Sequence, residues 1–223
     1  MMECKQTTPH HFTDVGDHTI VAMEYIVNNY GDISPADRRI LCLATMLHDI
    51  AKPVKKTTGP DGVDHFKGHP IEGEKMAEAF LRRLKYDNDT IKKVRKLVRY
   101  HDDRPELSYP SVRRFIRDVE PGNMDNLIRL KYADLYAHAK YLWDDKLYQV
   151  ETLDTMYRKI SEDNDPLSIR DLKVGGEDLM KAGIASGPAM GETLNMLLEC
   201  VLDEPSMNEK EKLLDVLSSK GSQ

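Results

Sequence analysis

The sequence is poor in cysteine, and no cysteine is placed for a disulfide framework or a zinc knuckle. Three occur among the 223 residues, Cys4, Cys42 and Cys200, and they are odd in number and far apart. Disulfide-rich domains and zinc knuckles use even sets or closely spaced pairs. The chain must therefore fold around an apolar core, which a chain of this length can bury without cross-links.

Long apolar segments are also missing. No stretch of eighteen apolar residues occurs, so no membrane-spanning helix is expected. The first residues, Met1–Gln6, lack the apolar run of a secretory leader. Hydrophobic residues make up 40% of the chain and charged residues 31%, which is typical of globular proteins. We expect a folded cytoplasmic protein that does not contact a membrane.

A basic excess is the third absence. The chain has 32 Lys and Arg residues against 38 Asp and Glu, a formal net charge of −6. This balance disfavours indiscriminate coating of nucleic acid, which depends on basic residues that neutralise phosphates. Basic residues nevertheless cluster within Lys92–Arg99 and within Arg113–Arg117. We interpret both clusters as solvated helix faces and leave a local basic patch open.

Helical periodicity fills most of the sequence, and no strand-rich region or repeat stands out, so the predicted fold class is all-α. Ser34 and Pro35 form a helix start, and Pro53 ends that helix near Ala51. Residues 53–69 predict a turn-rich loop, with a short hairpin left open. The predicted helices span 14–30, 34–51, 70–85, 88–101, 110–119 and 123–162. The predicted cap of the fourth is Asn88 or Asp89, and a break within the last is left open. Short helices follow after Pro166, with starts at Gly187–Pro188 and at Ser206.

One of these predicted helices contains a polar doublet where an apolar core is expected. His48 and Asp49 follow the run Ile40–Leu47, which is otherwise almost entirely apolar. Burial of an unpaired ionised carboxylate is costly, so Asp49 needs a partner. We predict that this partner is a divalent metal ion.

Other polar side chains lie on apolar helix faces. His101 continues the stripe that contains Val94 and Val98, and Asp134 continues the stripe that contains Leu127 and Leu130. All-α proteins build metal sites from side chains on facing helices. Imidazoles with carboxylates suit Mn, Fe, Ni, Co or Zn, whereas Mg prefers oxygen ligands. The candidate metal ligands are His18, His48, Asp49, His69, His101 and Asp134.

This pattern resembles the HD superfamily of metal-dependent phosphohydrolases. His18, the doublet His48–Asp49 and Asp134 in Ala133–Asp134 look like the defining ligand set of that family. His69 and His101 resemble the additional ligands of members that hold two metals, in which the equivalent of Asp49 bridges the ions. Lys52 matches a lysine near the substrate phosphate. Asp102 stands where some of those members have a further histidine, so the resemblance implies one or two ions.

A closer resemblance covers most of the chain, to the C-terminal HD region of bacterial CCA-adding tRNA nucleotidyltransferases. It rests on Asp17–Thr19, Phe66–His69, Leu167–Leu179 and Gly187–Gly191. It implies an HD helical bundle over residues 1–162, a helical C-terminal extension over 163–223 and a contact with tRNA. The Gly-Gly loop and paired aspartates of the nucleotidyltransferase head do not occur here, so we expect no nucleotide addition by this chain alone.

The resemblance implies a metal-dependent phosphodiesterase or phosphatase that acts on a nucleotide or an RNA-end phosphate. Asp49 would orient the attacking water, and Lys52 would contact the phosphate oxygens. The alternatives are an HD module that binds tRNA or another RNA without turnover, and a nucleotide-sensing module. His138, one turn beyond Asp134, is either a partner of the metal ligands or part of the helix surface.

Overall fold

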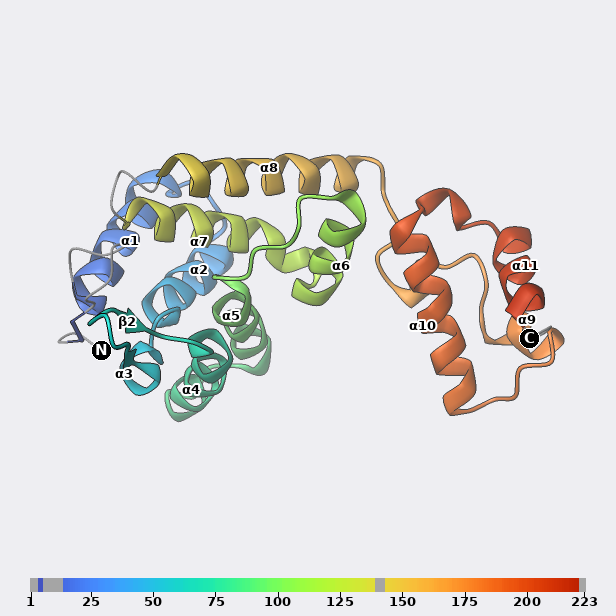
Figure 1. Ribbon diagram of the computed structural model, residues 1–223, viewed down its shortest axis with the longest axis horizontal. Helices are drawn as coiled ribbons and strands as arrows, with labels where there is room; N and C mark the ends of the chain where they lie inside the picture. The colour runs from blue at the N-terminus through green and yellow to red at the C-terminus, as the bar shows by residue number, and fades with distance from the viewer. Residues whose placement is uncertain (1–3, 6–13, 139–142, 221–223) are drawn as a thin grey trace. The chain divides into compact units, whose positions relative to one another are not determined.

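The protein is all-α, as predicted (Figure 1). The described residues also contain a small two-stranded sheet, which is a hairpin. The computed structural model describes residues 4–5, 14–138 and 143–220. The chain forms two compact units that interleave in sequence. The first unit contains residues 1–104 and 119–152, and the second contains residues 105–118 and 153–223.

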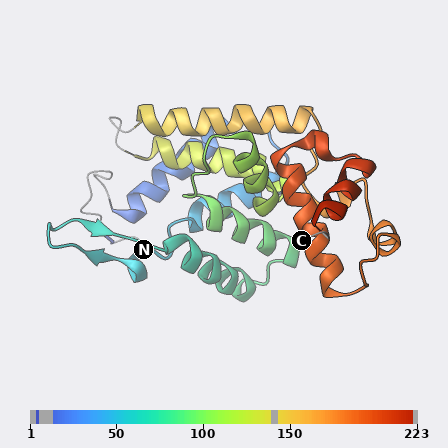
Figure 2. The ribbon, with the colours of Figure 1, turned by 45° about the vertical axis from the view of Figure 1, so that its right-hand side comes forward.

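The first unit is a helical bundle with one small hairpin. The hairpin pairs β1 (Thr57–Thr58) with β2 (Asp64–His65) in antiparallel register and projects from the helices, as Figure 2 shows. The option of a hairpin within residues 53–69 is thus confirmed. The helices of this unit are α1 (Val15–Asn29), α2 (Pro35–Leu47), α3 (Lys52–Lys55), α4 (His69–Arg83), α5 (Asn88–Tyr100), α7 (Met124–Tyr136) and the N-terminal half of α8 (Trp143–Glu162), with a 3-10 turn, η1 (Pro121–Asn123).

Three helix starts are fixed by side-chain caps. The carboxylate of Asp14 accepts a hydrogen bond from the backbone N–H of Asp17, and Ser34 caps α2 through the N–H of Asp37. The cap of α5 is Asp87, which accepts from the N–H of Thr90. The predicted cap at Asn88 or Asp89 was therefore one or two residues late.

Helix α2 ends at Leu47, four residues before the predicted end. Residues 48–51 form tight turns, in which the N–H of Ile50 donates to the carbonyl of Leu47 and the N–H of Lys52 donates to that of Asp49. These i to i−3 bonds replace the α-helical pattern. His48 and Asp49 are thus at a helix end, where their side chains can enter a cavity.

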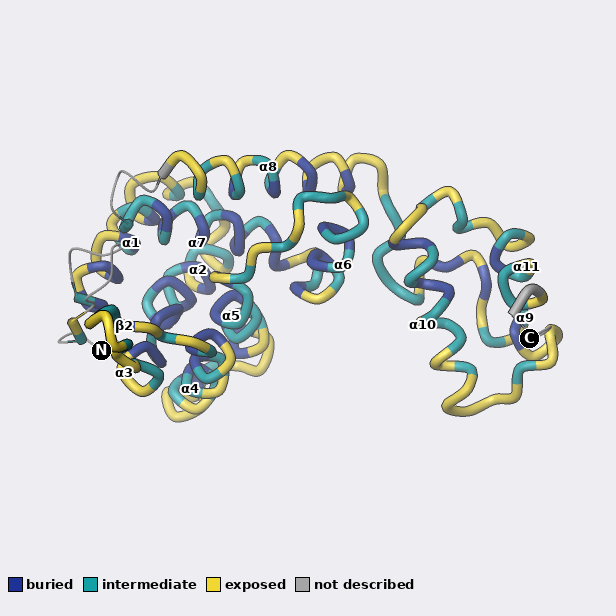
Figure 3. Tube along the Cα trace, in the orientation of Figure 1, coloured by how far each residue is buried: buried dark blue, intermediate teal, exposed yellow. Residues whose placement is uncertain are grey.

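The core of the first unit is formed where α7 packs against α1, α2 and α5, and α4 packs against α5. Figure 3 shows the buried positions of these helices turned toward one another and the exposed positions turned outward. Leu41, Leu97, Leu127 and Leu130 are fully buried. The predicted apolar stripes on α5 and α7 therefore face the core, and they bring His101 and Asp134 inward with them.

The second unit has its own apolar core. Its helices are α6 (Tyr109–Val119, whose last residue falls in the first unit), the C-terminal half of α8 (Trp143–Glu162), α9 (Gly176–Lys181), α10 (Pro188–Asp203) and α11 (Lys210–Lys220), with 3-10 turns η3 (Ile169–Asp171) and η4 (Pro205–Met207). Buried apolar side chains from this unit form one cluster: Leu172, Val174, Leu179, Leu197, Leu198, Val201, Leu202 and Leu213.

One predicted helix start differs from the structure in this region. The last helix begins at Lys210 and not at Ser206, because Ser206 lies in the 3-10 turn η4 that precedes it. The break left open within residues 123–162 occurs between α7 and α8, and residues 139–142 lie outside the described part. Residues 105–118 and 153–162 belong to the same compact unit as the C-terminal helices. The predicted domains, 1–162 and 163–223, remain a prediction.

None of the helices within residues 4–5, 14–138 and 143–220 is both long enough and apolar enough to span a bilayer.

Candidate metal centre

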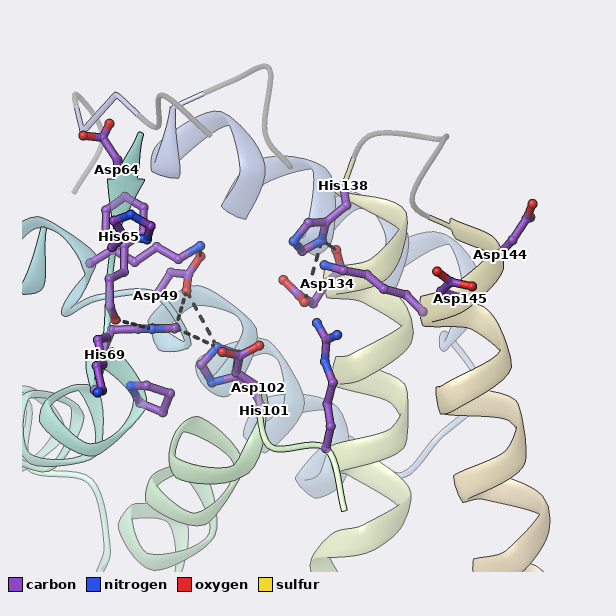
Figure 4. Close-up of a pocket in the computed structure, with 17 residues that line it drawn as sticks. Asp49, Asp64, His65, His69, His101, Asp102, Asp134, His138, Asp144 and Asp145 are labelled. Atoms are coloured by element: carbon purple, nitrogen blue, oxygen red, sulfur yellow. Dashed lines mark hydrogen bonds and ion pairs between the residues drawn. The ribbon is translucent and has the colours of Figure 1, made fainter. Parts of the chain in front are cut away.

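A cavity of about 890 Å³ opens in the first unit, and most of the predicted site residues line it (Figure 4). Its wall combines the turn after α2, the hairpin, the start of α4, the end of α5, the end of α7 and the start of α8. The predicted residues in the wall are Asp49, Lys52, His69, His101 and Asp134. His18 and His48 lie directly behind it and are fully buried.

One group of ligand atoms comes from α1, α7 and the end of α2. The Nε2 atom of His18 lies 2.9 Å from Oδ1 of Asp134 and 3.3 Å from Nε2 of His48. Nε2 of His48 in turn lies 3.5 Å from the same Asp134 oxygen. Residues distant in sequence therefore converge on one point, as the sequence predicts.

A second group comes from the start of α4, the end of α5 and the turn after α2. The Nε2 atoms of His69 and His101 lie 3.3 Å apart, and both are within reach of Oδ1 of Asp49, at 3.3 and 3.7 Å respectively. Figure 4 shows Asp49, His69 and His101 turned toward one another. These three side chains are buried. They form a second set that is able to hold a metal ion.

Asp49 is shared by the two groups. Its Oδ1 faces His69 and His101, whereas its Oδ2 lies 3.3 Å from Nε2 of His48 and 3.9 Å from Nε2 of His18. The side chain is 1% exposed, and neither oxygen accepts a hydrogen bond. The 2.6 Å contact of Oδ2 with Nζ of Lys52 is an ion pair. A carboxylate buried in this way is costly unless a cation binds it.

The four histidines are oriented by the same device. Each Nδ1 lies within hydrogen-bond distance of a backbone carbonyl oxygen, between 2.7 and 3.2 Å away, so Nδ1–H can donate and Nε2 is left facing the cavity. The acceptors are Ala137 for His18, Thr45 for His48, Phe66 for His69 and Val98 for His101. Such bonds fix the tautomer of metal-binding imidazoles and their direction.

The pairs of Nε2 atoms fit a metal better than they fit each other. When both Nδ1–H groups donate to carbonyls and both imidazoles are neutral, the two Nε2 atoms have no hydrogen to share, so such a pair needs either a proton or a metal ion between them. Two nitrogens that each lie about 2.0–2.1 Å from one tetrahedral ion are about 3.3 Å apart. Both observed Nε2 to Nε2 distances are 3.3 Å. The donor set and its spacing therefore fit divalent transition metals.

The charges of the metal-free site favour one bound proton. Burial lowers the pKa of His48, but the adjacent carboxylates of Asp49 and Asp134 outweigh that effect and raise it to about 10. Burial also opposes ionisation of Asp49, yet Lys52 and His48 hold its pKa well below the usual range. The pKa of His101 is lowered, chiefly by burial, so this imidazole is neutral at pH 7. A proton on His48 thus occupies the place of a cation.

His138 lies against the first group. Its Nδ1 is 2.6 Å from the backbone carbonyl oxygen of Asp134 and 3.8 Å from Oδ2 of that residue. Its ring centroid lies 5.0 Å from that of His18. Burial lowers the pKa of His138 to about 4, so it is neutral at pH 7. Of the two interpretations left open, contact with the metal-ligand candidates is the one that the structure supports.

Sequence reasoning missed several polar residues near the centre. Nζ of Lys131 on α7 donates to the carbonyls of His101 and Asp103, at 2.8 and 2.6 Å, and so holds the end of α5. Arg104 and Lys146 line the cavity. Lys131 carried a signal, because it lies on the apolar face of α7 one turn before Asp134. Arg104 and Lys146 lie outside any periodic pattern.

The comparisons with known proteins address the family of the chain. A family model described as tRNA nucleotidyltransferase domain 2 (putative) matches residues 71–217. The chain belongs to this family. It is also 29% identical over 193 residues to a CC-adding tRNA nucleotidyltransferase of Thermus thermophilus. The predicted relation to tRNA nucleotidyltransferases is therefore confirmed.

The extent of these matches limits what they say of the site. The alignment covers 85% of this chain but 41% of the Thermus thermophilus enzyme. The family model begins after His18, His48, Asp49 and His69 and includes only His101 and Asp134 of the predicted ligands. No solved structure matches the chain significantly. The chemistry of the site must therefore be argued from its geometry.

Proposed function

We propose that the chain is a metal-dependent phosphohydrolase that acts on a nucleotide or RNA-end phosphate ester. One observation supports this most strongly. Both carboxylate oxygens of Asp49 are buried without a hydrogen bond, and each faces a separate pair of histidines. A carboxylate shared between two histidine pairs is suited to two ions.

His18, His48, Asp134 and Oδ2 of Asp49 would hold one ion. His69, His101 and Oδ1 of Asp49 would hold the second. The spacing of these residues is that of the HD superfamily, to which we assign the chain. Mn, Fe, Ni, Co and Zn suit this mixture of imidazole and carboxylate better than Mg does.

When bound, such ions lower the pKa of water toward neutrality and polarise phosphate oxygens. Asp49 accepts a hydrogen bond from the attacking water and directs it. Lys52 is 6% exposed, lines the cavity and pairs with Asp49, so its ammonium group lies where it can also contact a phosphate oxygen. The carbonyl acceptors of the four histidines keep the imidazoles in place throughout.

The test is a hydrolysis screen with the purified chain. The chain is incubated with Mn²⁺, Ni²⁺ or Co²⁺ and with nucleoside monophosphates, 2′,3′-cyclic nucleotides or RNA with phosphorylated ends. The readouts are the release of inorganic phosphate and the opening of the cyclic phosphate to a monoester. We expect turnover that chelator abolishes and that Asp49→Ala reduces at least about a thousandfold. Lys75→Gln, on the exposed surface of α4, is the matched control. Undiminished hydrolysis by metal-bearing Asp49→Ala would refute the proposed role.

A second candidate is a tRNA-binding or nucleotide-sensing module without turnover. The family match over residues 71–217 favours a tRNA contact. A mobility-shift titration of tRNA, with duplex DNA of equal charge as the control, tests it. Tight, tRNA-selective binding combined with no product from any substrate would favour the module over the enzyme.

A further inference from the structure

Two basic side chains in the wall of the cavity do not belong to either set of candidate metal ligands. Arg104 lies three residues after His101, and Lys146 lies in the first turn of α8. Both line the same cavity as Asp49 and Lys52. Within the described part of the chain, neither Arg104 nor Lys146 makes a hydrogen bond or an ion pair. Several other basic residues of the first unit have an acidic partner, for example Arg95 with Glu74.

The two side chains are close enough to act on one another. Burial lowers the pKa of Lys146, and the positive charges of Arg104 and Lys52 lower it further, against the opposite effect of Asp134 and Asp102. Like charges that face one cavity raise its energy unless an anion binds between them. Arg104 offers a planar fork of donors and Lys146 a compact ammonium, and both groups suit phosphate oxygens.

The balance of charges makes anion binding depend on metal. The described lining contains six carboxylates and four basic side chains, so it is formally acidic without ions. Two divalent ions would reverse that sign. The volume of about 890 Å³ suits a ligand larger than a single phosphate.

We propose that Arg104 and Lys146 bind a second phosphate group of the ligand, so that the preferred substrate carries two phosphate groups on a short linker. The inference rests on the proposed function, in which the first phosphate lies at the metal groups. Arg104 and Lys146 thereby select among phosphate esters and do not take part in the chemistry.

The test compares two ligands that cannot be hydrolysed. Propane-1,3-bisphosphonate and propylphosphonate share a carbon chain and differ in the second anionic group. Their dissociation constants are measured by calorimetry with the manganese-loaded full chain. We expect the bisphosphonate to bind at least about tenfold more tightly, since each charge-assisted hydrogen bond contributes on the order of 1.5–3 kcal/mol. Equal affinity for the two ligands would overturn the proposal.

Variants locate the effect. Arg104→Gln and Lys146→Gln should each weaken bisphosphonate binding about tenfold and change propylphosphonate binding less than about twofold. Lys146→Arg should retain most of the difference, and Lys75→Gln should change neither constant. Equal losses for both ligands would show that Arg104 and Lys146 do not hold a second group. Without metal, both ligands should bind at least about tenfold more weakly.

The same measurement separates this inference from the proposed function. Selective bisphosphonate binding by a chain that hydrolyses nothing would support the second phosphate position and refute the hydrolase. Hydrolysis without a preference for two phosphates, and without an effect of Arg104→Gln, would support the hydrolase and refute the second position.

Discussion

Each of the two units contains a buried charged side chain, and these two side chains are paired in different ways. In the second unit, Arg113 is 9% exposed and its guanidinium is bound by Asp165 and by the carbonyl of Leu202. In the first unit, Asp49 is 1% exposed and neither of its oxygens accepts a hydrogen bond. The bonded guanidinium of Arg113 joins α6 to its neighbours, whereas the ion pair of Asp49 with Lys52 leaves both carboxylate oxygens without a hydrogen bond, which indicates a ligand.

The basic cluster at Arg113–Arg117 is conspicuous in the sequence, but in the structure its arginines form ion pairs within the second unit. Arg114 and Arg117 both bind Glu199, and Arg114 also binds Asp203. The interpretation as a solvated face is wrong for Arg113, which is buried. These arginines hold α6 against α10 within the second unit. A dense cluster of charge can thus be structural, while a two-residue doublet marks the candidate functional site.

The largest expected effect is stabilisation by metal. Ions that bind the folded state alone should raise the free energy of unfolding by about 4 kcal/mol at a thousandfold excess over the dissociation constant. Thermal unfolding with Mn²⁺ and then with excess chelator measures this. Identical melting temperatures under the two conditions would contradict the claim that the first unit binds metal.

Breaking the paired charge in the second unit is the next largest effect. Asp165→Asn leaves Arg113 without its carboxylate and should cost about 3 kcal/mol. Asp49→Asn in the metal-free protein should cost less, because His48 can release its proton and Lys52 borders the cavity, whereas the guanidinium of Arg113 stays charged and buried. Urea unfolding of both variants without metal compares them. A greater loss for Asp49→Asn would reverse the comparison.

The pH dependence of metal affinity sharpens the account of the first unit. The pKa of His48 is raised to about 10, so an ion that binds at pH 6–8 must displace one proton. Affinity should therefore rise about tenfold per pH unit, or about 2.7 kcal/mol between pH 6 and 8. Calorimetry in buffers of different ionisation enthalpy measures the proton released. A pH-independent constant would show that His48 is not a ligand.

The smallest effect concerns the support of the second histidine pair. Lys131→Met removes two hydrogen bonds at the end of α5 and should cost about 2 kcal/mol in stability. It should also weaken binding at His69 and His101 more than at His18 and His48. The control is Lys92→Met, at an exposed position of α5. Lys92 pairs with Glu120, which is also exposed, so this variant should cost less than about 0.5 kcal/mol in stability. Equal effects would deny Lys131 this role.

Much of the fold could be predicted because periodicity and caps are local signals. The starts at Ser34 and at Gly187–Pro188 were correct, and α6 was predicted within one residue. The early end of α2 depends on the turns at His48–Ala51, which form where the polar doublet meets the cavity. The place of residues 105–118 in the second unit depends on partners such as Asp165, which are distant in sequence.

The convergence of the six predicted ligands could be inferred because each is polar on an apolar face or beside a helix end. The proposed roles of Arg104 and Lys146 could not be inferred, because single basic residues in a loop or in the first turn of a helix carry no periodic signal. The supporting contact of Lys131 also depends on the approach of α7 to the end of α5, which the sequence does not specify.

The most direct test of whether Asp49 serves both groups of ligands is the metal content of the wild type and three variants. Each protein is saturated with Mn²⁺ and passed through gel filtration, and its metal is measured by inductively coupled plasma mass spectrometry. The wild type should retain two ions per chain, His18→Ala and His69→Ala one each, and Asp49→Ala none, with circular dichroism confirming that helicity is unchanged. Wild-type metal content in Asp49→Ala would contradict the account.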